Sequence, residues 1–480
     1  MGCERLGCPP AGLGSISKQE RSSPSRYLDT RRTLIWDGEE RQSPYRYLQL
    51  VTQKTTPQTY KESSMKKGQN TRGYARYLAF DIHREYILVG GQNEEQKWVL
   101  TPRRVSIVKF PGWAQKNLRQ GDIAVLETTT NVWETYDIVA PLVSHTLVAN
   151  ASGMGEIVGA RVKTDKEDIK RMLRALIGGI VPEVWVPPMH VRELRGFISY
   201  RGRLVKTGAM IRNRLQSLLH KHNLMLPEEG ILDQAWWKAQ RSISSLEKMQ
   251  IHQELALLDE IEKHKAAVDE ELGRQFTSKR WGAQAVRLVQ LPGVGVVIAM
   301  TVLSAIGDIS RFESAKRLVG YAGIGAGVHD SGKTHKEKKI TKKGRKELRW
   351  AMVEAAWRAV RMSPFWNAQY EKYLRRLRKK NQAIVVIARK LLVAIWHVLS
   401  KEETDEHASE EDLAYKMLLL SWSLNENVRK GLSYKQFAKY ALMQLGVETD
   451  ITRFVRRDVP RRLAPKEEVL ARMTELGLTT

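Results

Sequence analysis

Short apolar runs separated by polar turns fill residues 77–150, and they constrain the fold more than any other feature of the chain. YLAFDI and YILVGG flank the polar turn HREY and predict a β-hairpin, with QKWVL and VSIVKF supplying a third strand. IAVLET at 123–128 and HTLVAN at 145–150 predict two further strands, and NVWETYDIVAPLV between them has helical spacing. The segment therefore predicts an α/β sheet.

An amphipathic helix follows this sheet pattern. KTDKEDIKRMLRAL places apolar residues on one side, namely Ile169, Met172, Leu173 and Leu176. Thr164 and Glu167 match a capping box, and an acidic Asp165 in the first turn complements the helix dipole.

Four carboxylates lie where they can converge. Asp81 ends the first strand, Glu127 ends a central strand, and Asp165 and Asp168 share a face of the helix. Mg²⁺ prefers such oxygen ligands, and two ions about 4 Å apart can clamp both oxygens of a phosphodiester displacement. We therefore hypothesise an Mg²⁺ (or Mn²⁺) site on Asp81, Glu127, Asp165 and Asp168. Capping and dipole roles remain an alternative for the two helix residues, and Glu127 could be an ordinary strand-end charge.

The charge of the chain is strongly positive and unevenly spread. Lys and Arg number 79 against 53 Asp and Glu, a net charge of +26. Residues 331–380 hold 17 Lys and Arg against 4 Asp and Glu, a net +13, with aromatic residues interleaved. Such basic, aromatic-containing helices suit a groove that follows a phosphate backbone, so we expect DNA as a partner.

GVHDSGKT at 327–334 matches the phosphate-loop pattern G-x-x-x-x-G-K-[ST]. Its flanks do not fit, because YAGIGAG is a poor central strand and HKEKKITKKGRK is too charged for a buried first helical turn. An ATPase is therefore a minor alternative.

Residues 190–280 have helical spacing throughout. Leu258, Ile261, Val268 and Leu272 repeat every three or four residues, although Lys265 interrupts the seam. The pattern fits a coiled coil or an intramolecular helical hairpin equally well.

LVQLPGVGVVIAMTVLSAI at 288–306 has the pattern of a helix-hairpin-helix. Gly293 and Gly295 would permit a tight turn whose N–H groups bind a nucleic-acid phosphate. A plain turn between helices is the alternative.

The remaining features concern the location of the protein. The two cysteines, Cys3 and Cys8, lie in the leading tail, which favours a reducing cytosol. We find no apolar run of about 18 residues and no signal-peptide core, so we expect no membrane span and a cytoplasmic, nucleoid-associated protein. The polar residues before Met65 look like an over-extended or disordered arm.

The order of the acidic residues along the chain also resembles that of known protein families. The order D…E…D-x-x-D resembles that of RuvC-like nucleases with a ribonuclease-H fold. The string FDIH…LETT…RVKTDKEDIKRMLRAL resembles the N-terminal domain of the DEDD insertion-sequence transposases, the IS-one-ten family or bridge-RNA-guided recombinases. The resemblance continues through GYAGIGAGVHDSGK and ITKKGRKELRWAMVEAAW, covering residues 77–180 and 284–400.

The resemblance implies more than the residues do alone. It makes Ser331 the nucleophile, whereas a turn serine before glycine would otherwise be preferred. It also implies a structured noncoding RNA as partner and a homodimer or homotetramer joined through the coiled coil. The basic residues near Ser331 would neutralise phosphates: Lys333, Lys336, Lys342, Lys343, Arg345 and Arg349.

We predict an α/β plus α chain in five parts. They are an arm (1–74), a RuvC-like DEDD domain (75–185), a helical or coiled-coil linker (186–283), a mainly helical transposase domain (284–400) and a helical extension (401–480). The predicted function is a Mg²⁺-dependent DNA transposase or recombinase with a phosphoserine–DNA intermediate. The alternatives are a RuvC-like nuclease or Holliday-junction resolvase that uses water, and a DNA-binding protein without activity.

Overall fold

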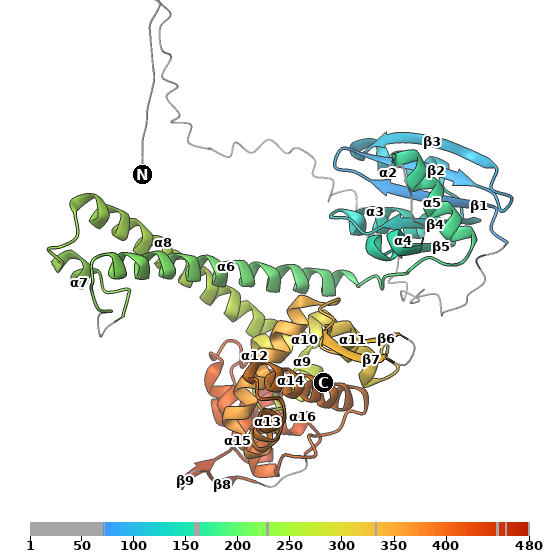
Figure 1. Ribbon diagram of the computed structural model, residues 1–480. Helices are drawn as coiled ribbons and strands as arrows, with labels where there is room; N and C mark the ends of the chain where they lie inside the picture. Colours follow the sequence, from blue (N-terminus) through green and yellow to red (C-terminus); the bar gives the residue numbers. More distant parts are fainter. Residues whose placement is uncertain are drawn as a thin grey trace, which may run out of the picture. The chain divides into compact units, whose positions relative to one another are not determined.

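The structure is a computed structural model of the 480-residue chain (Figure 1). It describes residues 71, 73–157, 164–226, 230–331, 334–447, 451–456 and 458–478, with the backbone alone for 326–331 and 334–339. The predicted arm before Met65, and Lys333 of the basic set, lie outside the described residues.

The first part of the described chain is built around a five-stranded mixed sheet (Figure 1). Its elements are β1 (Arg76–Ile82), β2 (Tyr86–Gln92), β3 (Trp98–Ser106), η1 (Ile107–Lys109), α2 (Phe110–Asn117), β4 (Asp122–Glu127), α3 (Val132–Val139), η2 (Ala140–Leu142), β5 (His145–Ala149), α4 (Ala151–Ile157) and α5 (Asp165–Ile177). The strand order is β3-β2-β1-β4-β5. β2 runs antiparallel to both β1 and β3, whereas β4 runs parallel to β1 and to β5.

Alternation along β1 gives the sheet two different faces. Leu78, Phe80 and Ile82 point into a core shared with α2 and α3. The other face is covered by α5, whose Ile169 lies where a side chain on Gly90 of β2 would be. Asp81 belongs to this second face, at the end of the strand, so the fold places its carboxylate beside the start of α5.

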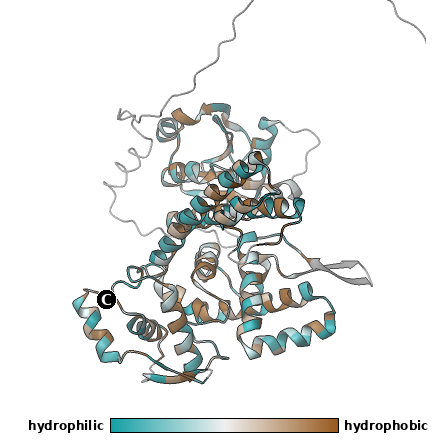
Figure 2. Cartoon of the chain, turned by 90° about the vertical axis from the view of Figure 1, so that its left-hand side faces the viewer, coloured by the Kyte–Doolittle hydropathy of each residue, from teal (hydrophilic) through white to brown (hydrophobic). Residues whose placement is uncertain are grey.

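The rest of the chain is mainly helical, as predicted. Its elements are α6 (Met189–Lys221), α7 (Gln234–Ala239), α8 (Ser245–Phe276), α9 (Gly282–Val289), α10 (Val296–Ile306), α11 (Ala315–Ala322), β6 (Ala326–Ser331), β7 (Thr334–Ile340), α12 (Lys346–Met362), α13 (Pro364–Leu377), α14 (Lys380–Ser400), α15 (Glu410–Ser423), α16 (Tyr434–Gln444), β8 (Arg453–Arg456), β9 (Val459–Arg462) and α17 (Lys466–Glu475). Most of these helices carry both hydrophobic and hydrophilic residues around their circumference (Figure 2).

Helices α6 and α8 form an antiparallel hairpin within the chain (Figure 1). Salt bridges cross it at Arg212–Glu262 (2.5 Å), Arg214–Glu254 (2.8 Å) and Lys221–Glu247 (2.8 Å). The seam residues Leu258, Val268 and Leu272 are buried inside the chain. The structure thus has the intramolecular hairpin, one of the two arrangements that the sequence allowed, and dimerisation through this seam stays a prediction.

The described residues of the predicted helical extension (401–480) pack on the helical core. Side chains of α15, α16 and α17 belong to the same buried cluster as those of α10, α12 and α14. Gln290 binds the segment between α14 and α15. Its side chain accepts a hydrogen bond from the Asp405 N–H (3.0 Å) and donates one to the Glu403 carbonyl (3.3 Å). The described residues between 401 and 478 are therefore an integral part of this helical core.

Helix α14 corrects one expectation from the sequence. It is long and apolar enough to cross a membrane by length and composition, contrary to our statement that no apolar run reaches that length. Half of its apolar stretch is nevertheless buried in the protein, where it packs against α11, α12 and α13. Its apolar character is accounted for by its place in the core.

Candidate active site

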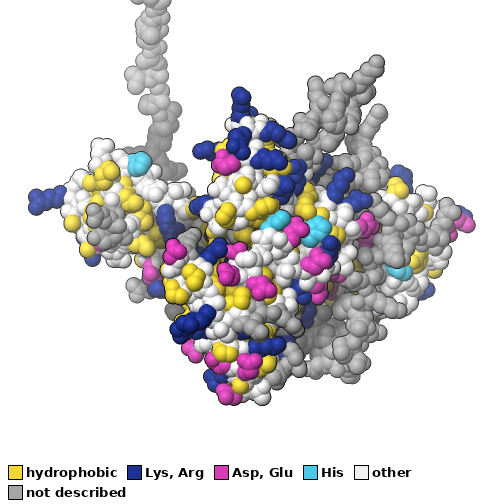
Figure 3. Space-filling view, turned by 90° about the horizontal axis from the view of Figure 1, so that it is seen from below, with side chains coloured by type: hydrophobic (Ala, Val, Ile, Leu, Met, Phe, Trp, Pro, Cys, Tyr) yellow, Lys and Arg dark blue, Asp and Glu magenta, His cyan; other side chains and the backbone are white. Residues whose placement is uncertain are grey.

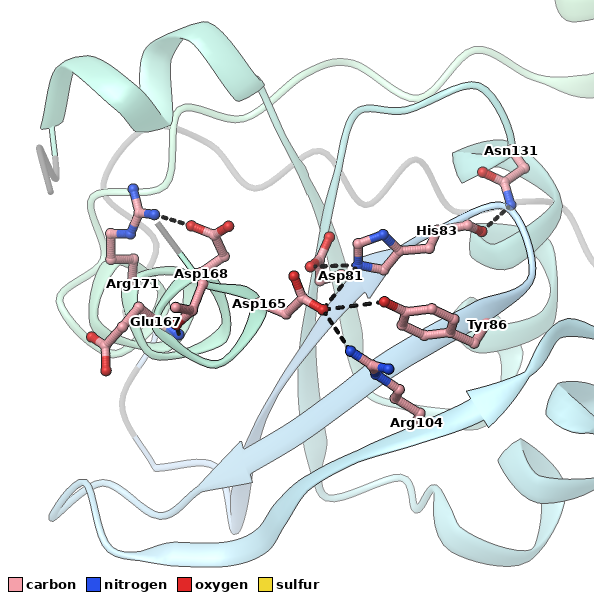
Figure 4. A network of polar contacts seen from close by, with 10 residues as sticks. Asp81, His83, Tyr86, Arg104, Asn131, Asp165, Glu167, Asp168 and Arg171 are labelled. Atoms are coloured by element: carbon pink, nitrogen blue, oxygen red, sulfur yellow. Dashed lines mark hydrogen bonds and ion pairs between the residues drawn. The ribbon is translucent and has the colours of Figure 1, made fainter. Parts of the chain in front are cut away.

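Asp81 and Asp165 meet at the end of β1. Together with His83 they form a group whose ligand atoms all lie within 4.8 Å of one another. His83 Nε2 lies 3.0 Å from Asp81 Oδ2 and 3.9 Å from Asp165 Oδ2. Figure 4 shows the three side chains pointing toward one another from β1, the following turn and α5. The structure therefore brings together two of the four predicted carboxylates and adds a histidine.

Tyr86 and Arg104 complete the surroundings of Asp165 (Figure 4). The Tyr86 hydroxyl donates a hydrogen bond to Asp165 Oδ2 (3.1 Å), and Arg104 donates another to the same oxygen (3.2 Å). The Tyr86 hydrogen bond, with the positive charges of His83 and Arg104, holds the pKa of Asp165 below its usual value. Asp165 is therefore ionised at neutral pH.

The strand register explains this convergence. Asp81 pairs with Leu88 of β2, and Leu88 pairs with Arg104 of β3, so the three lie in one row across the sheet. Phe80 pairs with Leu126 of the parallel strand β4, which puts Asp81 and Glu127 at equivalent positions on the same face. Glu127 thus ends β4 in the neighbouring position of the row, although it is not a member of the 4.8 Å group.

Asp168 behaves differently from Asp165. It forms an ion pair with Arg171 on its own helix, and Figure 4 shows it turned toward that arginine. The predicted cap of α5 is present in part, since the Thr164 hydroxyl accepts a hydrogen bond from the Glu167 N–H. The Glu167 carboxylate bonds Lys170 (2.6 Å). Of the predicted acidic residues at the start of α5, only Asp165 is directed at Asp81.

The donor set fits a divalent cation. Asp81 and Asp165 offer oxygen atoms at one point, and Asp165 already lies beside the Arg104 guanidinium and the His83 imidazole there. Carboxylate oxygens suit Mg²⁺ and Mn²⁺, and an imidazole nitrogen is better suited to Mn²⁺ than to Mg²⁺. Glu127 lies next to Asp81 in the same row of the sheet. Asp168 lies one turn after Asp165 on α5.

Three of these residues escaped the sequence reasoning: His83, Tyr86 and Arg104. His83 carried a signal, because it follows Asp81 by two residues and strand alternation then puts both on one face. Arg104 carried none, since its role depends on the pairing of β3 with β2.

Ser331 is the last residue of β6, at the turn end of a β-hairpin. It pairs with Thr334 of β7 in the antiparallel register. Backbone hydrogen bonds fix the base of this hairpin, from Thr341 N–H to the Gly325 carbonyl (3.2 Å) and from Lys342 N–H to the Gly323 carbonyl (3.1 Å). A two-stranded ribbon leading into the turn replaces the strand–loop–helix of a phosphate loop, so the ATPase alternative loses its structural context.

The predicted phosphate-binding residues divide into two groups. Lys342 is exposed beside the hairpin base, as is Lys343, and the described backbone places Lys336 on β7. Arg349 has a structural task, because it donates hydrogen bonds to the Ala322 (3.1 Å) and Lys342 (3.3 Å) carbonyls. Figure 3 shows Lys and Arg side chains gathered in the upper part of one face.

The two glycines of the predicted helix-hairpin-helix turn also differ. Gly293 has φ +83° and is buried against the backbone of α12, so its position has a packing role. Gly295 is partly exposed, with nothing within 4 Å of an added Cβ. Of the two, Gly295 is the one whose N–H a phosphate could reach.

Comparison with known proteins bears on this segment. Residues 285–371, which include α10, the Ser331 hairpin and α12, match the model of the IS116/IS110/IS902 transposase family. Over these residues the chain is similar to the IS116/IS110/IS902 transposase family. This agrees with the resemblance found in the sequence.

Individual relatives are similar to this chain over only part of their length. A putative transposase y4qE of Sinorhizobium fredii is 29% identical over 228 residues, 46% of this chain and 54% of that protein. The transposase for insertion sequence element IS1111A of Coxiella burnetii is 23% identical, over 50% of this chain and 68% of its own. A pilin gene-inverting protein of Moraxella bovis is 37% identical over 24% of this chain and 37% of its own. The chain thus spans about half the length of the first of these relatives.

Proposed function

We propose that this chain is a DNA transposase or recombinase that cuts and rejoins the DNA strands of an insertion sequence. The observation that carries the proposal is the family match over residues 285–371, the segment that contains Ser331. The relatives' names add support, since they include transposases and a pilin gene-inverting protein. The net charge of +26 supports a DNA partner.

The sheet is proposed to be a RuvC-like, ribonuclease-H-fold DEDD domain. Its support is the order β3-β2-β1-β4-β5, with Asp81 ending the central strand and Glu127 ending its parallel neighbour. Asp81, Glu127, Asp165 and Asp168 would hold Mg²⁺ or Mn²⁺, which when bound would stabilise negative charge on the phosphate. Asp168 would first have to leave Arg171.

The proposed chemistry conserves the number of phosphodiester bonds. The Ser331 oxygen bonds to a DNA phosphorus while the bond from that phosphorus to the leaving sugar oxygen breaks. The serine hydroxyl gives up its proton to the surroundings, and the leaving sugar oxygen takes up a proton from them. A sugar hydroxyl of a second strand then attacks the phosphoserine and restores the serine hydroxyl. Lysines such as Lys342 and Lys343 would neutralise the phosphates meanwhile.

Further parts of the proposal rest on the family resemblance. They are a structured noncoding RNA from the element as guide, assembly as a homodimer or homotetramer, phosphate binding at a helix-hairpin-helix turn through Gly295, and action in the cytoplasm on nucleoid DNA.

The decisive experiment looks for a protein–DNA adduct. Purified protein, Mg²⁺, labelled DNA carrying the element's junction and the element's flanking noncoding RNA are combined and run on a denaturing gel. We expect a covalent adduct in the wild type that Ser331→Ala and Asp81→Ala lose and that the exposed-serine control Ser400→Ala keeps. Cleavage without an adduct that persists in Ser331→Ala would instead establish a water-using nuclease or resolvase.

A further inference from the structure

Three arginines from separate segments gather at the C-terminal end of α10. Arg195 comes from α6, Arg311 from the segment after α10, and Arg345 from the position just before α12. We call them the arginine cluster. Arg195 donates hydrogen bonds to the Ser304 (2.7 Å) and Ala305 (2.9 Å) carbonyls, and Arg311 donates one to the Ile306 carbonyl (2.7 Å).

Aromatic rings pack against two members of the arginine cluster, Arg195 and Arg311. The Arg311 guanidinium lies over three rings, 4.3 Å from the centre of Trp185, 4.2 Å from Phe312 and 4.5 Å from Tyr321. The Tyr321 hydroxyl donates to the Ala305 carbonyl at 3.2 Å. These rings hold the Arg311 guanidinium in place and shield it partly from water, which strengthens its electrostatic effect.

Among the described side chains, no acidic group forms an ion pair with the arginine cluster. Among the described residues, no carboxylate lies within 4.0 Å of a nitrogen of Arg195, Arg311 or Arg345, and Asp308 is the acidic group whose charge reaches Arg311. Burial, and next the charge of Arg345, lowers the pKa of Arg195 to about 10. Burial also lowers the pKa of Arg311. Arg195 and Arg311 remain charged at neutral pH, so like charges are held together.

Arg345 is the member that lacks a structural explanation. Its Nε atom is buried and has no hydrogen-bond partner among the described residues. Its backbone N–H, by contrast, donates to the Tyr321 carbonyl at 2.9 Å, which fixes the residue at the base of the Ser331 hairpin. An unsatisfied buried donor costs about 1–3 kcal/mol, and such donors are rare unless a ligand or water completes them.

Capping of α10 explains only part of the cluster. The last carbonyls of a helix are partially negative and attract arginine, which accounts for Arg195 and Arg311. It does not account for the third arginine, whose buried nitrogen faces no carbonyl. An oxyanion with several acceptor oxygens would offset the repulsion among the three charges.

We propose that Arg195, Arg311 and Arg345 form a binding site for one phosphate group of a DNA backbone, which anchors the strand beside the hairpin that carries Ser331. The inference rests on the proposed function for its choice of ligand. The phosphate would position the DNA without reading its sequence, because guanidinium contacts to phosphate carry no base information.

Arg345→Gln tests this site, with Arg274→Gln as the matched control. Both variants remove one positive charge, but Arg274 is already paired with Glu270 and Glu271 on α8. The first measurement is the change of Tm with inorganic phosphate against sodium chloride of equal ionic strength. We expect phosphate to raise the Tm of the wild type and of Arg274→Gln and to leave that of Arg345→Gln unchanged.

The second measurement is the dissociation constant for duplex DNA as a function of salt. We expect Arg345→Gln to weaken binding about tenfold at low salt and to reduce the slope of log Kd against log salt by about one, with no such change in Arg274→Gln. Without phosphate, Arg345→Gln should be at least as stable as the wild type, because a repelling charge has gone. Should it fail to fold, Arg345→Lys keeps the charge and should lose the phosphate response in part.

Several outcomes would overturn the inference. They are an equal phosphate response in Arg345→Gln and wild type, a lower Tm of Arg345→Gln without phosphate together with unchanged DNA binding, or an effect confined to RNA. A phosphate response that depends on Arg345 in a protein that forms no Ser331 adduct would keep the site and defeat the proposed function. A Ser331 adduct in a protein whose phosphate response does not depend on Arg345 would support the proposed function and overturn the site.

Discussion

Gly293 touches the backbone of Ala355. A Cβ atom added to Gly293 would lie 2.1 Å from the Ala355 carbonyl oxygen and 2.8 Å from the Ala359 nitrogen, and the glycine has φ +83°. The turn between α9 and α10 therefore packs on α12 through a position where only glycine fits. This contact joins the first helices of the family-matched segment to its last part.

Gly293→Ala should destabilise the protein strongly. The unfavourable φ and the forced displacement of a helix backbone each cost roughly 1–3 kcal/mol, so we expect a loss of about 3 kcal/mol or more. Urea denaturation followed by circular dichroism measures it. Gly295→Ala is the control, since Gly295 has φ −113° and free space, and should change stability by less than about 1 kcal/mol. Equal losses in the two variants would contradict the packing role.

Arg104→Gln should strengthen divalent-cation binding. Arg104 lies 3.2 Å from Asp165 and competes for the carboxylate that a cation would use. Because an exposed ion pair is worth about 0.2–1 kcal/mol, we expect the Mg²⁺ or Mn²⁺ concentration at half-maximal stabilisation to fall about two- to fivefold. A thermal-shift titration measures this without activity. Arg103→Gln changes the neighbouring exposed residue, which points to the other face, and should leave the titration unaltered.

Glu247→Gln should lower stability at neutral pH but not in acid. Glu247 accepts hydrogen bonds from Lys221 (2.8 Å), His222 (3.0 Å) and Ser244, which hold its pKa well below the ordinary 4.5. A lowered folded-state pKa gives stability that is present above pH 4.5 and is lost as the pH falls toward the folded-state value. The gap in Tm between wild type and variant should therefore begin to narrow below about pH 4.5 and keep narrowing as the pH falls further. Glu260→Gln, on the exposed side of α8, should show a smaller gap at pH 7.

Gln290→Ala should loosen the C-terminal extension. Gln290 is 2% exposed, and its loss leaves the Asp405 N–H and Glu403 carbonyl without their side-chain partner. We expect a loss of about 1–3 kcal/mol and faster proteolysis between residues 401 and 409. Limited proteolysis with mass spectrometry locates the cleavage. The exposed Gln382→Ala should behave like the wild type, and an intact segment in Gln290→Ala would show that the α15–α17 core alone secures it.

The local elements of this protein follow from its sequence because their signals are local. Alternation in YLAFDI and YILVGG predicts β1 and β2, and the spacing of Ile169, Met172 and Leu173 predicts α5, all of which the structure contains. Strand-end positions for Asp81 and Glu127 came from the same patterns. The resemblance to a transposase family could also be recognised, since its motifs are short strings of consecutive residues.

Tertiary structure alone decided which of these elements meet. Arg104 reaches Asp165 only because β3 pairs with β2 in one register, and Arg195, Arg311 and Arg345 meet only because α6 and α12 pack at the end of α10. The apolar seam of α8 is likewise packed against α6 of the same chain. Periodicity fixes which side of an element is apolar, whereas the partner of that side is chosen by shape and packing between residues far apart in the chain.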